Sequence, residues 1–166
     1  LSSDEQYESL TGVQVEKARS LMENKCYLCH NPEAAMDARA APPMIAIKKH
    51  YSKDNQNRSA FIKSMWEFVE KPDESKVKLK GAYKRFGLMP YQPYKEEDIK
   101  LIAAYMYDHQ IEAPEWFKKH WKEKKHHRKE KKNKKLKQRS KRAKQHKEDS
   151  TQRFAKRGKK IALATK

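Results

Sequence analysis

The sequence predicts an all-α protein in two parts, a helical domain over residues 1–117 and a basic helical or disordered tail over residues 118–166. Apolar side chains in the first part recur every three or four residues, as on one face of a helix, and no segment alternates like a strand. Charge is segregated as well, because the tail carries 23 Lys and Arg against 4 Asp and Glu, whereas the first part carries 17 against 18. The formal net charge of +18 therefore belongs to the tail.

Within the first part, the apolar periodicity predicts four helices, over residues 11–30, about 59–70, about 74–85 and about 96–109. Thr11, with Gln14 three residues later, has the pattern of a capping box at the start of the first helix. Asn57 or Ser59 caps the second helix. Residues 31–58, which contain two adjacent prolines, are predicted to be mostly loop.

The most informative segment is Cys26-Tyr27-Leu28-Cys29-His30, a C-x-x-C-H motif at the end of the first predicted helix. This is the attachment signature of c-type haem: two thiols one turn apart can add to the two vinyl groups, and the adjacent histidine can bind the iron. A zinc site would need two more ligands, and the chain has no other cysteine. A thioredoxin-like dithiol would lie in a βαβ pattern, which the sequence lacks. The motif therefore predicts one covalent haem c on Cys26 and Cys29, with His30 as iron ligand.

Two further segments accompany the motif: Ala41-Pro42-Pro43-Met44 follows it, and Leu88-Met89-Pro90 precedes the last predicted helix. Together the three resemble the class I c-type cytochromes, with their mitochondrial cytochrome c-like fold, over most of the first part. The resemblance implies a helical domain wrapped on one covalently bound haem. It also implies Met89 as the second iron ligand, and the carbonyl of Pro42 or Pro43 as the acceptor that orients the proximal imidazole. The Lys-rich tail has no counterpart in the family.

Other side chains compete with Met89 for the iron. Three methionines, Met22, Met65 and Met106, lie on apolar helix faces, where packing is the default role. Two others, Met36 and Met44, follow the motif closely. A second histidine, His50 or His109, would give bis-histidine ligation. An open sixth position would instead suggest ligand sensing or peroxidase-like chemistry.

Polar side chains near the expected haem are candidates for hydrogen bonds to its propionates or to the methionine sulfur. They are Trp66, Tyr91 and Tyr94, with Gln92 between the two tyrosines. Ordinary packing in the wall and core of the domain is the alternative role for each of them.

Methionine–histidine ligation raises the potential of a haem relative to bis-histidine ligation. An iron with both axial positions filled exchanges electrons but offers no position to a substrate, so the sequence predicts a single-electron carrier and no enzyme. The resemblance implies electron transport in a respiratory chain, in the periplasm or another extracytoplasmic compartment. The alternative is a haem-based sensor or a docking subunit of a larger respiratory complex. No apolar run approaches the roughly 20 residues of a membrane span.

Three functions are open to the basic tail. It could be a solubilising extension, it could dock on acidic redox partners or an anionic membrane surface, or it could bind nucleic acid through phosphate contacts. Residues 122–153 contain no Phe, Tyr or Trp to stack on bases, so nucleic acid is the least favoured partner. Like charges four residues apart repel on a helix, which predicts a tail that is largely unfolded or a fraying helix.

Overall fold

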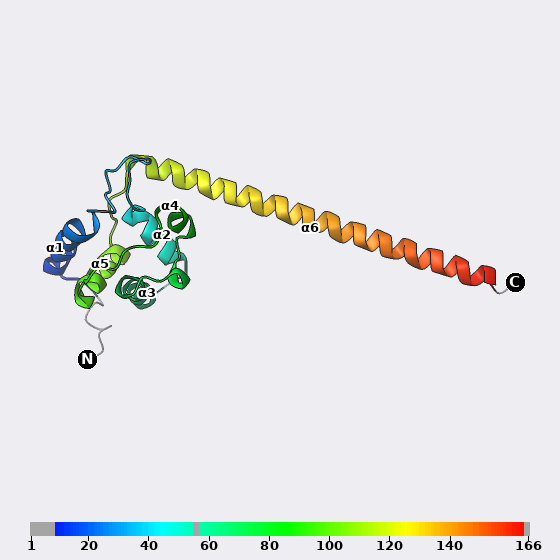
Figure 1. Ribbon diagram of the computed structural model, residues 1–166, viewed down its shortest axis with the longest axis horizontal. Helices are drawn as coiled ribbons and strands as arrows, with labels where there is room; N and C mark the ends of the chain where they lie inside the picture. Colours follow the sequence, from blue (N-terminus) through cyan, green and yellow to red (C-terminus); the bar gives the residue numbers. More distant parts are fainter. Residues whose placement is uncertain (1–8, 55–56, 165–166) are drawn as a thin grey trace. The chain divides into compact units, whose positions relative to one another are not determined.

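A computed structural model describes the backbone of residues 9–54 and 57–164, and the side chains of residues 9–53 and 57–153. The described part of the chain contains helices and no strand, so the predicted all-α class is confirmed. The elements are α1 Gly12–Leu21, the π-helical turn η2 Met22–Cys26, α2 Met44–Asp54, α3 Arg58–Glu70, the 3₁₀ turn η3 Glu74–Lys76, α4 Lys80–Phe86, α5 Glu96–Asp108 and α6 Glu115–Ala164 (Figure 1). The chain separates into two compact units, Leu1–Phe117 and Lys118–Lys166.

The core of the first unit forms where α5 packs against α1, α2 and α3 (Figure 1). Helix α5 is buried along most of its length because it contacts partners on more than one side. The largest fully buried side chains are Phe61 of α3 and Ile102 and Met106 of α5. Burial of side chains of this size stabilises a fold by about 1.5–3 kcal/mol each. Ala18 of α1 is also fully buried in this cluster, so a small residue stands where α1 meets the core.

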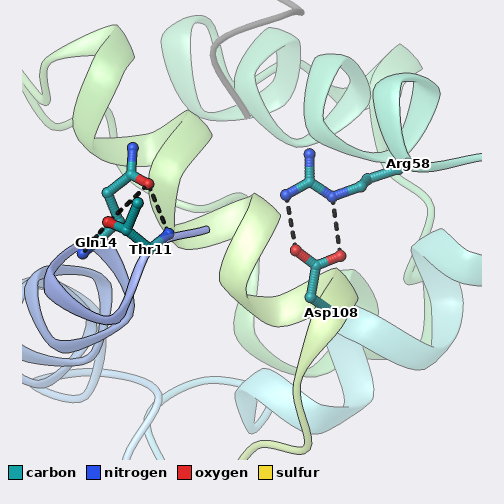
Figure 2. Close-up of polar contacts among 4 residues, drawn as sticks. All are labelled: Thr11, Gln14, Arg58 and Asp108. Atoms are coloured by element: carbon teal, nitrogen blue, oxygen red, sulfur yellow. Dashed lines mark hydrogen bonds and ion pairs between the residues drawn. The ribbon is translucent and has the colours of Figure 1, made fainter. Parts of the chain in front are cut away.

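Local signals set the starts of α1 and α3. At α1 the predicted capping box is present: the Thr11 hydroxyl accepts from the Gln14 backbone N–H, and the Thr11 N–H donates to the Gln14 side chain at 2.9 Å (Figure 2). At α3 the cap is Asn57, whose side-chain oxygen accepts from the Ala60 N–H at 2.8 Å. Ser59, the other candidate, lies inside the helix.

An ion pair joins the ends of α3 and α5. The Arg58 guanidinium donates two hydrogen bonds to the Asp108 carboxylate, at 2.7 and 2.8 Å (Figure 2). Nearby, the Lys48 ammonium of α2 donates to the backbone carbonyl of His109 at 2.6 Å. Planar bidentate pairing adds geometric specificity to the attraction of the charges. These contacts set where the C-terminal end of α5 lies against α2 and α3.

Three predictions about helices in the first unit were wrong in part. The first helix is α-helical only as far as Leu21 and then widens into η2. The Tyr27 N–H donates to the Met22 carbonyl five residues back, and the Asn24 side-chain amide donates to the Ser20 carbonyl. The segment 31–58, predicted to be mostly loop, contains α2.

The prolines in that segment mark the start of a helix. The Pro43 carbonyl accepts from the Ala46 and Ile47 N–H groups, and a proline suits this place because it has no N–H of its own to satisfy. Met44 and Tyr51 are buried and hold α2 on the core. The third predicted helix is likewise divided into η3 and α4, and Gly87 ends α4 with φ of 78°.

The described part of the basic tail is one helix, so of the two predicted states, helical or disordered, the structure has the helical one. Helix α6 contains 50 residues. The chain has no proline after Pro114 and only Gly158 as a glycine beyond it. Lys, Arg, Gln and Glu are good helix formers, and their low intrinsic cost outweighs the repulsion of like charges that the sequence suggested. None of the described helices combines the length and hydropathy that crossing a membrane requires.

The first turn of α6 belongs to the first unit. The Trp116 indole N–H donates to the Ala34 carbonyl at 2.9 Å, and the Arg39 guanidinium lies 4.6 Å from the centre of the same ring system. Phe117 is only 4% exposed. Trp116 and Phe117 are therefore part of the packing of the first unit, and Trp121 belongs to the second unit.

Candidate functional site

The C-x-x-C-H motif lies in a tight turn at the end of η2. The Cys26 carbonyl accepts from the His30 N–H at 2.9 Å and from the Cys29 N–H at 3.2 Å, which closes the five residues into a single turn. Cys26 packs partly buried against the core, whereas Cys29 and Leu28 are exposed. Two thiols and an imidazole are thus gathered on one turn, as the spacing predicted.

The imidazole of His30 is oriented by the backbone. Its Nδ1 lies 2.6 Å from the carbonyl oxygen of Pro42. A carbonyl only accepts hydrogen bonds, so Nδ1 carries the proton and Nε2 keeps its lone pair for a metal. Burial lowers the pKa of His30, although the Pro42 carbonyl opposes that shift, and the neutral ring is the form that binds a metal. Of the two candidate prolines, Pro42 makes this contact.

The thiol of Cys26 is in a different environment from that of Cys29. Burial raises the pKa of Cys26 to about 11, and the neighbouring Lys25 opposes this shift. The Cys26 thiol is therefore largely protonated near neutral pH, since the thiolate forms only as the pH approaches the pKa.

A polar clamp holds the residue that precedes Cys26. The Lys25 ammonium forms an ion pair with the Asp98 carboxylate at 3.0 Å, and Asp98 is 9% exposed. The Tyr94 hydroxyl donates to the Lys25 carbonyl at 3.1 Å. The start of α5 and the loop before it thereby hold the motif in place. Sequence reasoning missed Lys25 and Asp98, because 73 residues separate them and neither lies in a motif.

The other predicted site residues lie in several places. Met89 is partly buried in the loop between α4 and α5 and packs against the core cluster that Cys26 also contacts. Trp66 packs partly buried on the same cluster, and the hydroxyl of Tyr94 is engaged by Lys25. Tyr91 is 66% exposed.

The competing ligand candidates are mostly engaged elsewhere. The buried methionines are part of the core, and they are Met22, Met44, Met65 and Met106. The ring of His109 stacks on that of Tyr105 with centroids 5.0 Å apart, at the end of α5. Met36 and His50 are each partly exposed. Met89 differs from these methionines because it lies in the loop before α5 and is partly buried against the core.

A recess beside the motif does not suit a haem. It has a volume of about 720 Å³ and is lined by Tyr27, Leu28 and three acidic side chains, Glu23, Glu33 and Glu112. Haem carries two anionic propionates, which these carboxylates would repel. Neither the two thiols nor His30 line this recess.

The donor set nevertheless fits an iron porphyrin. Nowhere in residues 9–53 and 57–153 do three or more His, Cys, Asp or Glu side chains gather to hold a bare metal ion. A haem needs only two axial ligands from the protein, and an oriented imidazole, two thiols on one turn and a loop methionine match that need. No protein-family model, curated protein or solved structure matches this chain. The assignment of the site therefore rests on its own residues.

Proposed function

We propose that the first unit is a monohaem c-type cytochrome, similar to class I, that carries single electrons. The observation that supports this most is the contact of His30 Nδ1 with the Pro42 carbonyl inside a C-x-x-C-H turn. A histidine used only for packing needs no adjacent pair of thiols, and a redox dithiol needs no histidine whose Nε2 is left free for a metal.

Each residue has a defined role in this proposal. Cys26 and Cys29 would attach the porphyrin through thioether bonds, and His30 Nε2 and the Met89 sulfur would bind the iron. Haem c, when bound, supplies an iron that alternates between the ferrous and ferric states and so holds or releases one electron. The Pro42 carbonyl keeps the imidazole in one orientation and raises its basicity as a ligand. The soft sulfur of Met89 favours the ferrous iron and raises the potential.

The setting that we propose is a respiratory chain in the periplasm or another extracytoplasmic compartment. If His30 and Met89 both bound the iron, the protein would exchange electrons with redox proteins and would offer no iron position to a substrate. The near-neutral first unit and the strongly basic second unit divide the work between redox chemistry and electrostatic docking. Acidic docking surfaces on redox partners fit such a charge distribution.

Replacement of Met89 tests the ligand assignment. In the purified holoprotein, Met89→Ala should retain covalent haem, lower the reduction potential and allow carbon monoxide to bind the ferrous iron. Reduced-minus-oxidised spectra with and without carbon monoxide, and a potentiometric titration, measure these effects. Met36→Ala is the matched control, because it removes a partly exposed methionine just after the motif.

The outcomes separate the candidate functions. An unchanged potential and unchanged spectra in Met89→Ala would contradict the ligand assignment. Ready binding of carbon monoxide by the unaltered protein would favour a haem-based sensor over a carrier. Covalent haem should be lost when Cys26 and Cys29 are both replaced by alanine, and its retention in the double variant would contradict attachment at the motif.

A further inference from the structure

The acidic side chains of α6 are concentrated on one face, whereas basic side chains occur all round the helix. Every residue from Lys122 to Asp149 is exposed. Three of the four acidic residues of the second unit, Glu123, Glu130 and Glu148, follow one another at spacings of seven and eighteen residues. Seven residues bring an α-helix back to within about 20° of the same direction, and eighteen residues complete five turns. The three carboxylates therefore lie along one line of the helix, with His126 and His127 pairing with Glu130 when protonated.

The opposite face carries a continuous row of basic side chains, which we call the basic stripe. Its members recur at alternating spacings of three and four residues, and they are Lys125, Arg128, Lys132, Lys135, Arg139 and Arg142. At about 100° per residue they fall within a sector of about 100° that is centred opposite the glutamates. None of the six forms an ion pair with another described residue. The stripe is about 26 Å long, at 1.5 Å per residue.

The length of the exposed basic segment indicates an extended partner. From Lys122 to Arg153 the helix is about 47 Å long, whereas a small globular domain is about 30 Å across. A single small acidic protein could therefore cover the stripe, which is about 26 Å long, but would leave the basic residues beyond its ends uncontacted. A flat anionic surface can contact the basic stripe along its whole length, because the stripe stays on one side of a straight helix.

The side chains of the stripe indicate which extended anion they suit. The stripe itself holds three lysines and three arginines, whereas residues 118–153 as a whole hold 14 lysines and 4 arginines. The same residues lack Phe and Tyr, and their single Trp121 stands before the stripe begins. Lysine-rich polybasic segments are typical of binding to anionic lipid headgroups. Leu136, at 53% exposure, is the one large apolar side chain between Lys122 and Arg153, so contact would be at the headgroup surface without insertion.

We propose that residues 122–153 dock this protein on an anionic phospholipid leaflet through the basic stripe. This inference concerns the second unit alone and does not depend on the proposed haem. The attraction arises from lysine and arginine side chains next to lipid phosphates, and it weakens with salt because mobile ions screen exposed charges beyond about 10 Å at 0.1 M ionic strength. The glutamate line faces away from the leaflet, which avoids repulsion between carboxylates and phosphates.

The test compares two charge-reversed variants of the full chain with equal net charge. The stripe variant carries Lys132→Glu, Lys135→Glu and Arg139→Glu, and the matched control carries Lys134→Glu, Lys137→Glu and Lys141→Glu on the glutamate side. Binding is measured by co-sedimentation with vesicles of phosphatidylcholine alone and of phosphatidylcholine mixed equally with phosphatidylglycerol. The unaltered protein should bind only the mixed vesicles, and less at high salt. The stripe variant should bind at least about tenfold more weakly, and the control within about threefold of the unaltered protein.

Other results would overturn the proposal. Equal losses in both variants would mean that the face is irrelevant, and equal binding to both vesicle types would exclude recognition of anionic lipid. Tighter binding to a duplex oligonucleotide than to the mixed vesicles, at the same salt concentration, would assign the stripe to nucleic acid. Far-UV circular dichroism confirms that each variant is helical. If charge reversal unfolds the stripe variant, the same six positions changed to Gln in two matched sets give the same comparison without adding negative charge.

Discussion

At the scale of single residues, the histidine of the motif depends on one carbonyl. The Pro42 oxygen lies 2.6 Å from His30 Nδ1 and so assigns the proton to that nitrogen. From the sequence, the carbonyls of Pro42 and Pro43 were equally good candidates for the hydrogen bond to the imidazole. Only one of two consecutive carbonyls can face the same imidazole, because the backbone turns between them. The path of the chain into α2 therefore selected Pro42.

The two cysteines should differ in reactivity when no haem is attached. Burial raises the pKa of Cys26 to about 11, so at a pH of about 8 its thiolate fraction is about one in a thousand. Cys29 is exposed and should be alkylated first by iodoacetamide. The reactivity of Cys26 should increase as the pH rises towards 11, since deprotonation produces the nucleophile.

Mass spectrometry of the tryptic peptides measures this order of alkylation. A denatured sample is the control, because unfolding removes the burial and should make the two cysteines react at similar rates. Faster modification of Cys26 than of Cys29 in the folded protein would contradict the burial of Cys26.

At the scale of elements, short-range hydrogen bonds define where helices begin. The Asn57 side chain accepts from the Ala60 N–H, whereas Ser59 lies one residue inside α3. Asn and Ser are both strong caps, so composition alone could not separate them. The two positions differ in backbone conformation, and only the residue with extended dihedrals, here Asn57 with φ of −108° and ψ of 158°, can present its side chain to the first free N–H groups.

Removal of the cap at α3 should therefore be costly at one position only. Asn57→Ala should lower the free energy of unfolding by about 1 kcal/mol, because one N–H at the start of α3 loses its acceptor. Ser59→Ala, the matched control, should change it by less than about 0.5 kcal/mol. Urea unfolding followed by circular dichroism gives both values. A larger loss of stability in Ser59→Ala than in Asn57→Ala would contradict the assignment of the cap to Asn57.

At the scale of the whole molecule, the two units differ in how they are stabilised. The first unit has a buried core around α5, and its contacts include Trp116 and Phe117. In the second unit every residue from Lys122 to Asp149 is exposed, so this stretch of α6 is helical through local propensity and has no core of its own. The two units can therefore respond independently to mutation.

Deletion of residues 122–166 should leave the first unit intact. The truncated protein keeps Trp116 and Phe117, so its melting temperature should change by less than about 3 °C. Its haem spectrum and potential should equal those of the full chain, while its association with anionic vesicles should be lost. Calorimetry and co-sedimentation measure these properties side by side. A large loss of thermal stability would show that the first unit depends on the deleted helix.

Local patterns carried much of the fold. The capping box of Thr11 and Gln14, the periodicity of α3 and α5, and the separation of charge between the two parts are all properties of neighbouring residues, and the sequence predicted them. The C-x-x-C-H spacing is likewise local, and its turn is present. Such features are predictable because their hydrogen bonds and charges lie within a few residues of one another.

Only the tertiary structure decided the rest, because it depends on residues far apart in the chain. Lys25 meets Asp98 across 73 residues, and the His30 imidazole finds the Pro42 carbonyl twelve residues on. Helix α2 follows two prolines that looked like loop, since burial of Met44 and Tyr51 stabilises it there. The sequence by itself determined which chemical groups are available. Packing determined which of them meet, because burial and direction arise only when distant segments are brought together.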